Sequence, residues 1–485
     1  MSKKLFFLIF IVFKGAAGQL SVSNIFEYQL GNLPQTSPSN LSTHYDQLNI
    51  SYRYTDFLIT GKLEHFQNPN SMQSYTHVAQ RSLSFKKDGL KLKIGNFYQI
   101  FGRGLLLRTY EIPGVVREDF SFRSRYGFYR DIDGFWAGYE TSWFEFSALR
   151  GKPLREELPP VVSRDDHRVN LIEGTELNLF ISEVTLSGMY LRNNKDDNLQ
   201  EYTSFALAAN LPMNIQFYGE YARELEGEEA FFDISDRTAH GLYLSMNLIL
   251  GSAGFTAEVK DYNKLFLGFN DPPSLVKEHE YLLLNRRTHN SEPLNESGWQ
   301  AEFIYTLNGG HSIVANMSES TNKTPFRNFL AQEKFLEVGI HFTEEMTIKG
   351  FADLGREDLR LEMDRYTYGV YIENKWFEKL GTTIDIEYQN FIRGLTVHRK
   401  IENYAALFSL SYAHDLSVGL IFEHTTNPGE IFREWIGYNL SYQYSQHHLI
   451  SMFYGKRRGG NVCTAGICYQ VLPFEGFEFR LTSAL

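Results

Sequence analysis

Apolar and polar residues alternate along most of this chain. The clearest example runs from Asn403 to Glu423 and is interrupted only at His414-Asp415. Before the interruption one face carries Tyr404, Ala406, Phe408, Leu410 and Tyr412, whereas Asn403, Ser409 and Ser411 fall on the other face; after it, Leu416, Val418, Leu420 and Phe422 form the next apolar stripe. Because successive side chains of a strand point to opposite faces, the pattern predicts a β-hairpin with one apolar face.

The same period of two recurs elsewhere in the chain. Further apolar stripes are Leu48-Ile50-Tyr52-Tyr54, Phe57-Ile59-Gly61-Leu63, Leu242-Leu244-Met246-Leu248-Leu250 and Ile436-Tyr438-Leu440-Tyr442-Tyr444. Aromatic residues at the ends of a stripe, with smaller apolar residues between them, are typical of strands that face lipid. A soluble β-sandwich also alternates, since it buries one face of each sheet. The connections between strands must therefore distinguish the two folds.

Short and long connections alternate along the chain. The short ones are Thr55-Asp56, 86–89, 140–142, 210–214, 308–310, 343–345, His414-Asp415 and 445–447, and the long polar ones lie near 31–45, 67–79, 99–131, 151–168, 224–236, 262–297, 319–332, 354–364, 391–401, 424–432 and 456–473. Outer-membrane barrels have this arrangement, with short periplasmic turns and longer extracellular loops. The sequence therefore predicts an all-β fold, a single antiparallel up-and-down transmembrane β-barrel of about 24 strands (22–26). The alternative is a soluble all-β protein.

The N-terminus predicts export. Lys3 and Lys4 precede an apolar run from Leu5 to Phe13, and Gly15-Ala16-Ala17-Gly18 suits cleavage before Gln19. We therefore expect a signal peptide over 1–18, a barrel over 19–485 with both termini periplasmic, and location in a Gram-negative-type outer membrane. A formal net charge of -11 argues against nucleic acid as a partner. Because the first strand begins near Leu20, no N-terminal plug is expected, so loops fold inward or the pore is wide.

The segment 99–131 is the candidate inward loop. Its glycines allow close approach to a crowded wall, and its charged residues offer a constriction that selects solutes. The candidate constriction residues are Arg103, Arg108, Arg117, Glu118, Asp119, Arg123, Arg125 and Arg130. The alternative is a salt-bridged loop without selectivity. The segment also offers an additional hairpin, Leu105–Arg108 against Phe128–Asp131, which would raise the count to about 26 strands.

Two other segments carry candidate chemistry. Glu278-His279-Glu280 lies in the long segment 262–297 and resembles a metal-binding fragment, but without further ligand spacing we interpret it as a solvated charge run. Cys463 and Cys468 enclose four residues, two of them small, in an oxidising compartment, so we expect a structural disulfide in the last extracellular loop or in the barrel mouth. We expect no metal and no cofactor.

Two stretches of the sequence are distinctive: one is Lys456-Arg457-Arg458-Gly459-Gly460 through Cys463 and Cys468 into Pro473 to Leu481, and the other is Gly95 to Leu105. Both resemble segments of an uncharacterised family of bacterial outer-membrane β-barrel proteins. The resemblance covers nearly the whole mature chain and implies a membrane location, with no activity attached. Phe477, Phe479 and Leu481 also resemble the C-terminal signal for barrel assembly, although the chain ends in Ser483-Ala484-Leu485 without a terminal aromatic residue.

The sequence carries no enzyme motif that we recognise. It contains no Gly-x-Ser-x-Gly, phosphate-binding loop or dinucleotide fingerprint, and solvation explains Asp165-Asp166-His167, its one tight acid–histidine cluster. The leading hypothesis is a pore or transport channel for a hydrophilic solute. The alternatives are a scaffold or sheath for a secretion or electron-transfer partner, and a lipid-modifying barrel enzyme. Expected partners are outer-membrane lipid, the barrel-assembly machinery, and a periplasmic or secretion partner.

Overall fold

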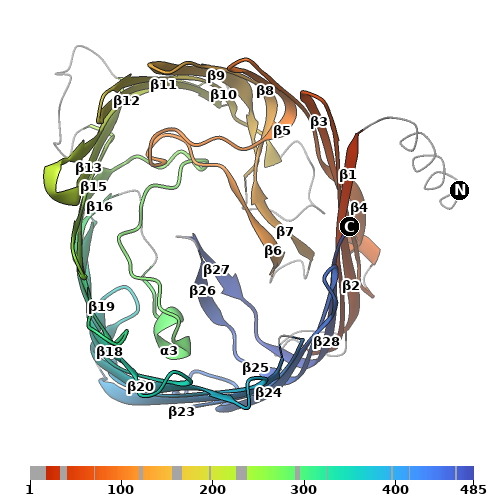
Figure 1. Ribbon diagram of the computed structural model, residues 1–485, viewed down its shortest axis with the longest axis vertical. Helices are drawn as coiled ribbons and strands as arrows, with labels where there is room; N and C mark the ends of the chain where they lie inside the picture. Colours follow the sequence, from red (N-terminus) through yellow and green to blue (C-terminus); the bar gives the residue numbers. More distant parts are fainter. Residues whose placement is uncertain are drawn as a thin grey trace, which may run out of the picture.

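The structure, a computed structural model, describes residues 18–32, 41–69, 71–119, 124–155, 167–195, 198–225, 238–289, 295–324, 326–394, 397–413, 415–464 and 467–485. In these residues, 24 antiparallel strands form one sheet that closes where β1 (Gln19–Asn32) pairs with β28 (Phe474–Ala484) (Figure 1). The predicted single large β-barrel of about 24 strands is confirmed. The expected signal peptide falls almost entirely outside the described residues.

The wall strands follow one another around the barrel in chain order. Between β1 and β28 they are β2 (Leu41–Tyr54), β3 (Phe57–Gln67), β4 (Tyr75–Lys87), β5 (Leu90–Phe97), β8 (Ile132–Glu140), β9 (Phe144–Pro153), β10 (Leu171–Ile181), β11 (Val184–Lys195), β12 (Asn198–Leu211), β13 (Ile215–Glu224), β14 (His240–Leu250), β15 (Ala253–Asn263), β16 (Asn295–Thr306), β17 (Ser312–Lys323), β18 (Asn328–His341), β19 (Met346–Glu357), β20 (Glu362–Trp376), β21 (Leu380–Arg393), β22 (Arg399–Tyr412), β23 (Leu416–Thr425), β24 (Glu434–Ser445) and β25 (His448–Arg457). Two 3-10 turns, Ser71–Gln73 and Pro212–Asn214, lie in the connections.

The alternating apolar and polar residues of the sequence form the outer and the inner face of the barrel. On β22, Phe408 is 46% exposed on the outer face, whereas Asn403 is 1% exposed on the inner face. The exposed outer residues of the neighbouring strand β23 are Leu416, Val418, Leu420 and Phe422. An apolar exterior around a polar interior is the arrangement that lipid requires of a spanning barrel. Within the part of the chain that the structure describes, no helix is long and apolar enough to cross a bilayer.

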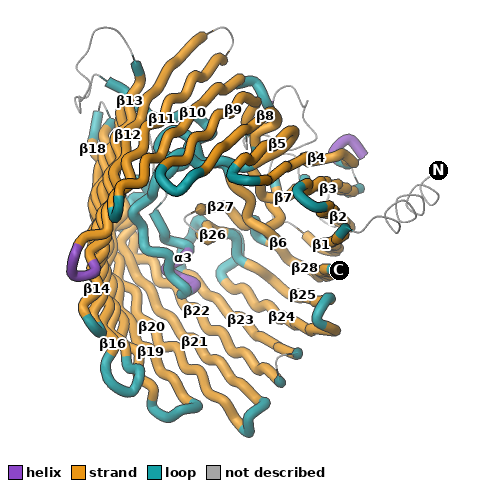
Figure 2. Tube along the Cα trace, turned by 45° about the horizontal axis from the view of Figure 1, so that its top comes forward, coloured by secondary structure: helices purple, strands orange, loops and turns teal. Residues whose placement is uncertain are grey.

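The short turns gather at one rim of the barrel, and both ends of the barrel sheet lie at this rim (Figure 2). Leu485 exchanges backbone hydrogen bonds with Val22 at 2.8 and 2.9 Å, and the N–H of Ala484 donates to the carbonyl of His447 in the turn between β24 and β25 at 2.9 Å. We call this the turn rim, and the opposite edge the loop rim. An even number of strands places both ends at one rim, as the sequence predicted.

Three long connections run inside the barrel rather than away from it (Figure 1). We call them the first insert (98–131, described except 120–123), the second insert (264–289) and the third insert (458–473, described except 465–466). Their regular elements are β6 (Tyr110–Glu118) paired with β7 (Arg125–Arg130), α3 (Leu282–Asn285), and β26 (Gly460–Thr464) paired with β27 (Ile467–Val471). The predicted additional hairpin of Leu105–Arg108 against Phe128–Asp131 is wrong, because β6 pairs with β7 apart from the wall. The wall therefore keeps 24 strands.

Candidate functional site: the interior of the barrel

One side of the interior is filled by an apolar core. Residues Phe101, Leu105, Leu106 and Leu107 of the first insert are fully buried. They pack with Leu265, Leu267, Phe269 and Leu275 of the second insert and with wall residues such as Trp136, Ile172, Leu191 and Tyr262. The wall residues come from β5 and from β8 to β15, so the two inserts and this side of the wall share one packed apolar core.

Backbone hydrogen bonds join the first two inserts. The N–H of Arg108 donates to the carbonyl of Phe269 at 3.1 Å, and the N–H of Asp271 donates to the carbonyl of Gly104 at 3.2 Å. The buried amide of Asn270 donates to the carbonyl of Leu105 at 2.9 Å. Gly104 has a φ of +93°, and a Cβ there would lie 2.8 Å from the carbonyl oxygen of Asp271. Glycine is therefore required where the inserts meet.

Wall glutamates hold the second insert along its length. Each one meets a different donor of the insert: Glu302 meets Lys277 at 2.5 Å, Glu333 meets His279 at 2.6 Å, Glu337 meets Tyr281 at 2.7 Å, Glu387 meets the N–H groups of Leu282 and Leu283 at 2.6 and 2.8 Å, Glu423 meets Arg286 at 2.7 Å, Glu362 meets Arg287 at 2.6 Å, and Glu357 meets His289 at 2.8 Å. These glutamates come from β16, β18, β19, β20, β21 and β23. The insert is thus fixed to six of the 24 wall strands, all between β16 and β23, by charge-assisted hydrogen bonds.

The interpretation of Glu278-His279-Glu280 as a solvated charge run is wrong for its central residue. His279 is 3% exposed and bonded to Glu333, whereas the side chain of Glu280 is 86% exposed. In the described parts of the chain, no group of three or more His, Cys, Asp or Glu side chains is arranged to hold a metal ion. Of the acid–histidine cluster near 165, only the buried His167 lies in the described residues, since Asp165 and Asp166 fall outside them.

Burial and ion pairing change the acidity of two residues in the second insert. Burial lowers the pKa of Arg287 to about 9, against the opposing effect of Glu362. Burial also acts to lower the pKa of His289, but hydrogen bonds to Glu296 and Glu357 outweigh it and raise the pKa to about 9. His289 is therefore a cation at neutral pH and takes part in an ion pair with wall carboxylates.

The third insert is tied to the other two. Cys463 and Cys468 form a disulfide across the β26–β27 hairpin. The N–H of Cys463 donates to the side chain of Asn285 in α3 at 3.0 Å, and the rings of Tyr469 and Phe128 meet edge to face at 5.3 Å. All three inserts therefore form one connected body inside the barrel. The cysteines were expected in the last extracellular loop or in the barrel mouth, and their position inside the barrel agrees with the second place.

The candidate constriction residues lie along the first insert and contact different parts of the protein. The N–H of Arg103 donates to Glu220 on β13 at 2.8 Å, Arg108 pairs with Asp271 of the second insert at 3.3 Å, and Arg125 pairs with Glu27 on β1 at 2.9 Å. Arg117 lies over the ring of Phe128, Arg130 donates to the carbonyl of Asn270 at 3.3 Å, Glu118 ends β6, Asp119 follows it, and Arg123 is outside the described residues. The contacts of Arg103, Arg108, Arg125 and Arg130 join the first insert to the wall and to the second insert. The role of the candidate residues in selectivity stays a prediction.

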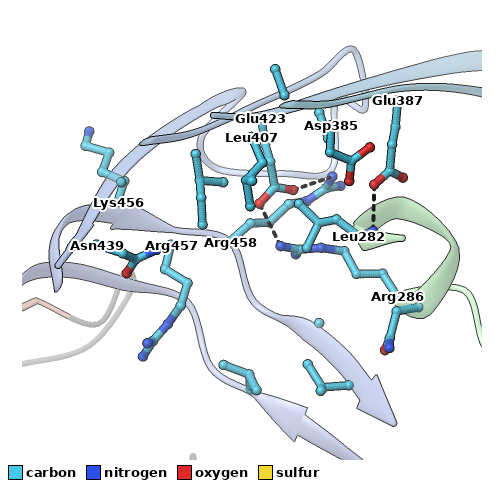
Figure 3. A pocket seen from close by; sticks show the side chains of 18 of the residues that line it. Leu282, Arg286, Asp385, Glu387, Leu407, Glu423, Asn439, Lys456, Arg457 and Arg458 are labelled. Atoms are coloured by element: carbon cyan, nitrogen blue, oxygen red, sulfur yellow. Dashed lines mark hydrogen bonds and ion pairs between the residues drawn. The ribbon is translucent and has the colours of Figure 1, made fainter. Parts of the chain in front are cut away.

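Open space remains on the opposite side of the interior, over β21 to β25. One cavity of about 450 Å³ lies between the second insert, the third insert and the wall (Figure 3). We call it the charged cavity; its ionic residues include Arg286, Asp385, Glu387, Glu423, Arg457 and Arg458, and Leu407, Ile421, Val462 and Val471 are among its apolar ones. A second cavity of about 450 Å³, the hydroxyl cavity, is lined by residues that include Thr383, Ser409, Ser417, Ser441 and Ser451.

The two cavities adjoin each other. Leu407, Ile421 and Asn439 line both of them. Ser417 is the second residue of β23 and Ser441 lies near the end of β24, so the hydroxyl cavity lies toward the turn rim, while the charged cavity lies beside the inserts. A path lined by hydroxyl and charged groups among apolar side chains therefore extends along the inner wall from the turn rim up to Arg286 and Arg458.

The C-terminal strand completes the wall beside this path. Glu478 and Arg480 of β28 point inward, where Arg480 pairs with Glu27 at 3.3 Å. Phe477, Phe479 and Leu481 alternate with them and lie on the outer face, where the rings of Phe479 and Phe26 lie 6.4 Å apart. This placement agrees with lipid contact, and their part in assembly stays a prediction.

A family model described as "Family of unknown function (DUF6029)" matches residues 15–115 and 252–485, more than half of the chain. The chain belongs to this family. The matched ranges of DUF6029 contain the whole second and third inserts and the first insert up to residue 115. The segments that border the charged cavity are therefore within the part of the chain that the family model covers. No curated protein matches the chain.

Solved structures similar to this DUF6029 chain are large barrels. The P pilus usher (PapC) translocation pore is similar with a TM-score of 0.50 at 9% sequence identity, over 96% of this chain and 99% of that chain. OccK5 (OpdH) of Pseudomonas aeruginosa has a TM-score of 0.40 at 14% identity, over 73% of this chain and 96% of that chain. OccK3 (OpdO) of Pseudomonas aeruginosa has a TM-score of 0.39 at 8% identity, over 97% and 96%. The likeness to the usher pore is one of fold.

Sequence reasoning missed the second insert as part of the interior, and for the third insert it left an extracellular loop and the barrel mouth open as alternatives. Pro272 and Pro273 correctly marked a loop, but a loop rich in charge and proline was expected to be solvated. The missed signal was the spacing of inward glutamates on β16 to β23. Each strand alternates in the same way whether its inner face meets water or an ion pair, so the pattern alone does not reveal what the glutamates bind.

Proposed function

We propose that this protein is an outer-membrane channel for small hydrophilic solutes, with its lumen narrowed by the three inserts. The observation that supports the proposal is the pair of adjoining cavities along β21 to β25. A barrel of this size encloses more space than wall side chains fill. Here the inserts occupy one side of that space with an apolar core and leave, on the other, a path that carries hydroxyl and charged groups.

The lining of the path suits transient contact with solutes. Thr383, Ser409 and Ser417 offer hydroxyl groups that exchange hydrogen bonds with a solute and with water. Such neutral groups bind weakly enough to release what they hold, which conduction requires. Beyond them the solute meets Arg286, Arg458 and Glu423, where the second and third inserts approach the wall.

The apolar exterior supports the membrane location. The outer stripe of β22 and β23 is exposed and apolar, and an exposed apolar band of this kind is stable only against lipid or a partner. Export to the outer membrane agrees with the signal sequence expected over 1–18.

Planar-bilayer recording tests the channel. Purified protein in symmetrical KCl should give discrete current steps of small size, because the inserts occupy much of the lumen. Ser409→Trp should reduce the current, since its side chain would enter the hydroxyl cavity. Ser187→Trp on β11, an inward residue on the opposite wall, is the matched control for bulk inside the barrel.

Two results would contradict the channel. One is the absence of current both in the wild-type protein and in a variant whose second insert has been released from the wall. The other is an equal effect of Ser409→Trp and Ser187→Trp. Stoichiometric co-purification of a partner from native membranes, together with the absence of current, would favour a scaffold instead.

A further inference from the structure

The charged cavity has two ends of opposite charge. Asp385 and Glu387 lie side by side on β21, two residues apart on the inner face. Arg457 lies at the far side of the cavity, with Leu407 between it and the two carboxylates (Figure 3). Arg457 lies 3.5 Å from Glu478 and stacks over the rings of Phe453 and Phe474.

Each end keeps a polar atom that is buried and unsatisfied. Within the described residues, Oδ1 of Asp385 and Nε of Arg457 have no hydrogen-bond partner. A buried donor or acceptor without a partner costs about 1–3 kcal/mol, so such atoms are commonly satisfied by water or a ligand. Oδ1 of Asp385 thus lacks a donor and Nε of Arg457 lacks an acceptor, while Nη2 of Arg457 is paired with Glu478.

The charges between the two ends are balanced within the protein, although Nε of Arg286 and Oε2 of Glu423 also have no hydrogen-bond partner among the described residues. Arg286 and Arg458 share Glu423, at 2.7 and 3.9 Å, and Arg458 also pairs with Glu430 at 2.9 Å. This network of two cations and two anions favours neither a net anion nor a net cation as the ligand. What remains for recognition is the separated pair of ends and the apolar surface between them.

The apolar surface between the two ends also contributes to the choice of ligand. Leu407 and Ile421 from the wall and Val462 and Val471 from the third insert all line the cavity. A cavity of about 450 Å³ with mainly apolar walls and a few fixed polar groups is typical of a small-molecule site. A ligand that fits has an apolar body, with a cationic donor at one end and an anionic acceptor at the other.

We propose that the charged cavity is a binding site for zwitterionic solutes with apolar side chains, of the class of short peptides. The ammonium group lies against Asp385 and Glu387, the carboxylate lies against Arg457, and the side chains contact Leu407, Ile421 and Val462. The proposal rests on the proposed channel function and names the solute class of the same path. The hydroxyl cavity then connects the site with the turn rim.

Single-channel recording with four probes tests the site. Leu-Leu carries both charges, N-acetyl-Leu-Leu carries only the carboxylate, Leu-Leu amide carries only the ammonium, and glucose carries neither. Leu-Leu should interrupt the KCl current at the lowest concentration. Each analogue that lacks one charge should need roughly 10-fold more or beyond, since a charged hydrogen bond contributes about 1.5–3 kcal/mol. Glucose should give no interruptions in this range.

Two variants assign the ends of the ligand. Asp385→Asn should abolish the preference for Leu-Leu over N-acetyl-Leu-Leu and keep the preference over the amide. Arg457→Gln should do the reverse. Lys400→Gln, at an exposed outer-face pair on β22, should change neither preference.

The outcomes distinguish a failure of the proposed binding site from a failure of the proposed channel function. If current flows but the wild-type protein responds equally to Leu-Leu and its two analogues, or prefers an analogue, the zwitterion site is wrong and the channel stands. If current is absent in the wild-type protein and after release of the second insert, the channel is wrong. Should a variant fail to insert into the bilayer, the four-probe series on the wild-type protein decides alone.

Discussion

Arg286 of the second insert donates a hydrogen bond to Glu423 of β23 at 2.7 Å, and a second one to the carbonyl of Gly459 in the third insert, also at 2.7 Å. One guanidinium thus joins the wall to two inserts that are far apart in the sequence. Both side chains are mostly buried. Non-covalent contacts of this kind hold the inserts inside the barrel, because the backbone joins each insert to the wall only at its two ends.

Arg286→Met should loosen the second insert and enlarge the channel. The change leaves Glu423 buried with only Arg458 at 3.9 Å, and breaking a buried ion pair costs about 3–5 kcal/mol. We expect a larger single-channel current in KCl and faster proteolysis of the insert, while the barrel stays folded in detergent. Lys400→Gln removes one partner of an exposed pair with Glu402 and should leave the current unchanged. Equal currents for wild-type and Arg286→Met would show that the insert does not limit conduction.

A substitution by arginine should have different effects on the two faces of β22. Phe408→Arg places a charge on the apolar outer face, where it costs about 2–4 kcal/mol near the centre of a bilayer. Ser409→Arg, the next residue, places the charge in the hydroxyl cavity, where water solvates it. We expect Phe408→Arg to lower the free energy of unfolding measured in lipid vesicles, and Ser409→Arg to leave it nearly unchanged but to reduce the current. Similar losses of stability at both positions would contradict the assignment of the faces.

The wall of the barrel was predictable because it rests on local patterns. Stripes such as Tyr404 to Tyr412 and turns such as Thr55-Asp56 mark each strand by itself, and β22 and β23 are paired as the pattern of Asn403 to Glu423 predicts. Strand number follows from counting these units. The pairing of Cys463 with Cys468 needed only their short separation and an oxidising compartment.

The interior was not predictable in the same way, because its contacts join residues that are distant in the sequence. Asn285 meets Cys463, and Leu282 meets Glu387, across more than one hundred residues. A charged residue in a long connection has the same local pattern whether it is solvated or paired inside. His279, which the sequence assigned to a solvated run, is buried because Glu333 lies opposite it on β18.

Removal of the disulfide should loosen the third insert. In the chain-entropy view, a bridge that closes a loop of six residues contributes about 2 kcal/mol to the stability of its hairpin. The β26–β27 hairpin lies between Phe128 and Asn285, so a looser hairpin should give a noisier and larger current. We expect this result for the double variant Cys463→Ser/Cys468→Ser and for the wild-type protein treated with a thiol reductant. The reductant should have no effect on the double variant, and an effect there would point to a cause other than this bridge.

Stability should fall at alkaline pH through His289. Its pKa is raised to about 9 in the folded protein from an ordinary value near 6.5, because Glu296 and Glu357 accept its hydrogen bonds. A raised pKa means that the protonated form stabilises the fold. The contribution is complete below pH 6.5 and is lost as the pH rises through about 9. The shift corresponds to about 3 kcal/mol.

The measurement compares wild-type protein with His289→Gln, whose side chain does not titrate. Unfolding by urea in lipid vesicles, followed by tryptophan fluorescence, gives the free energy of unfolding at pH 6.5 and at pH 10. We expect the wild-type protein to be more stable than the variant at pH 6.5 and to lose most of that advantage at pH 10. Other groups that titrate in this range are common to both proteins and cancel in the difference. A difference that does not change with pH would mean that His289 is not held as a cation between Glu296 and Glu357.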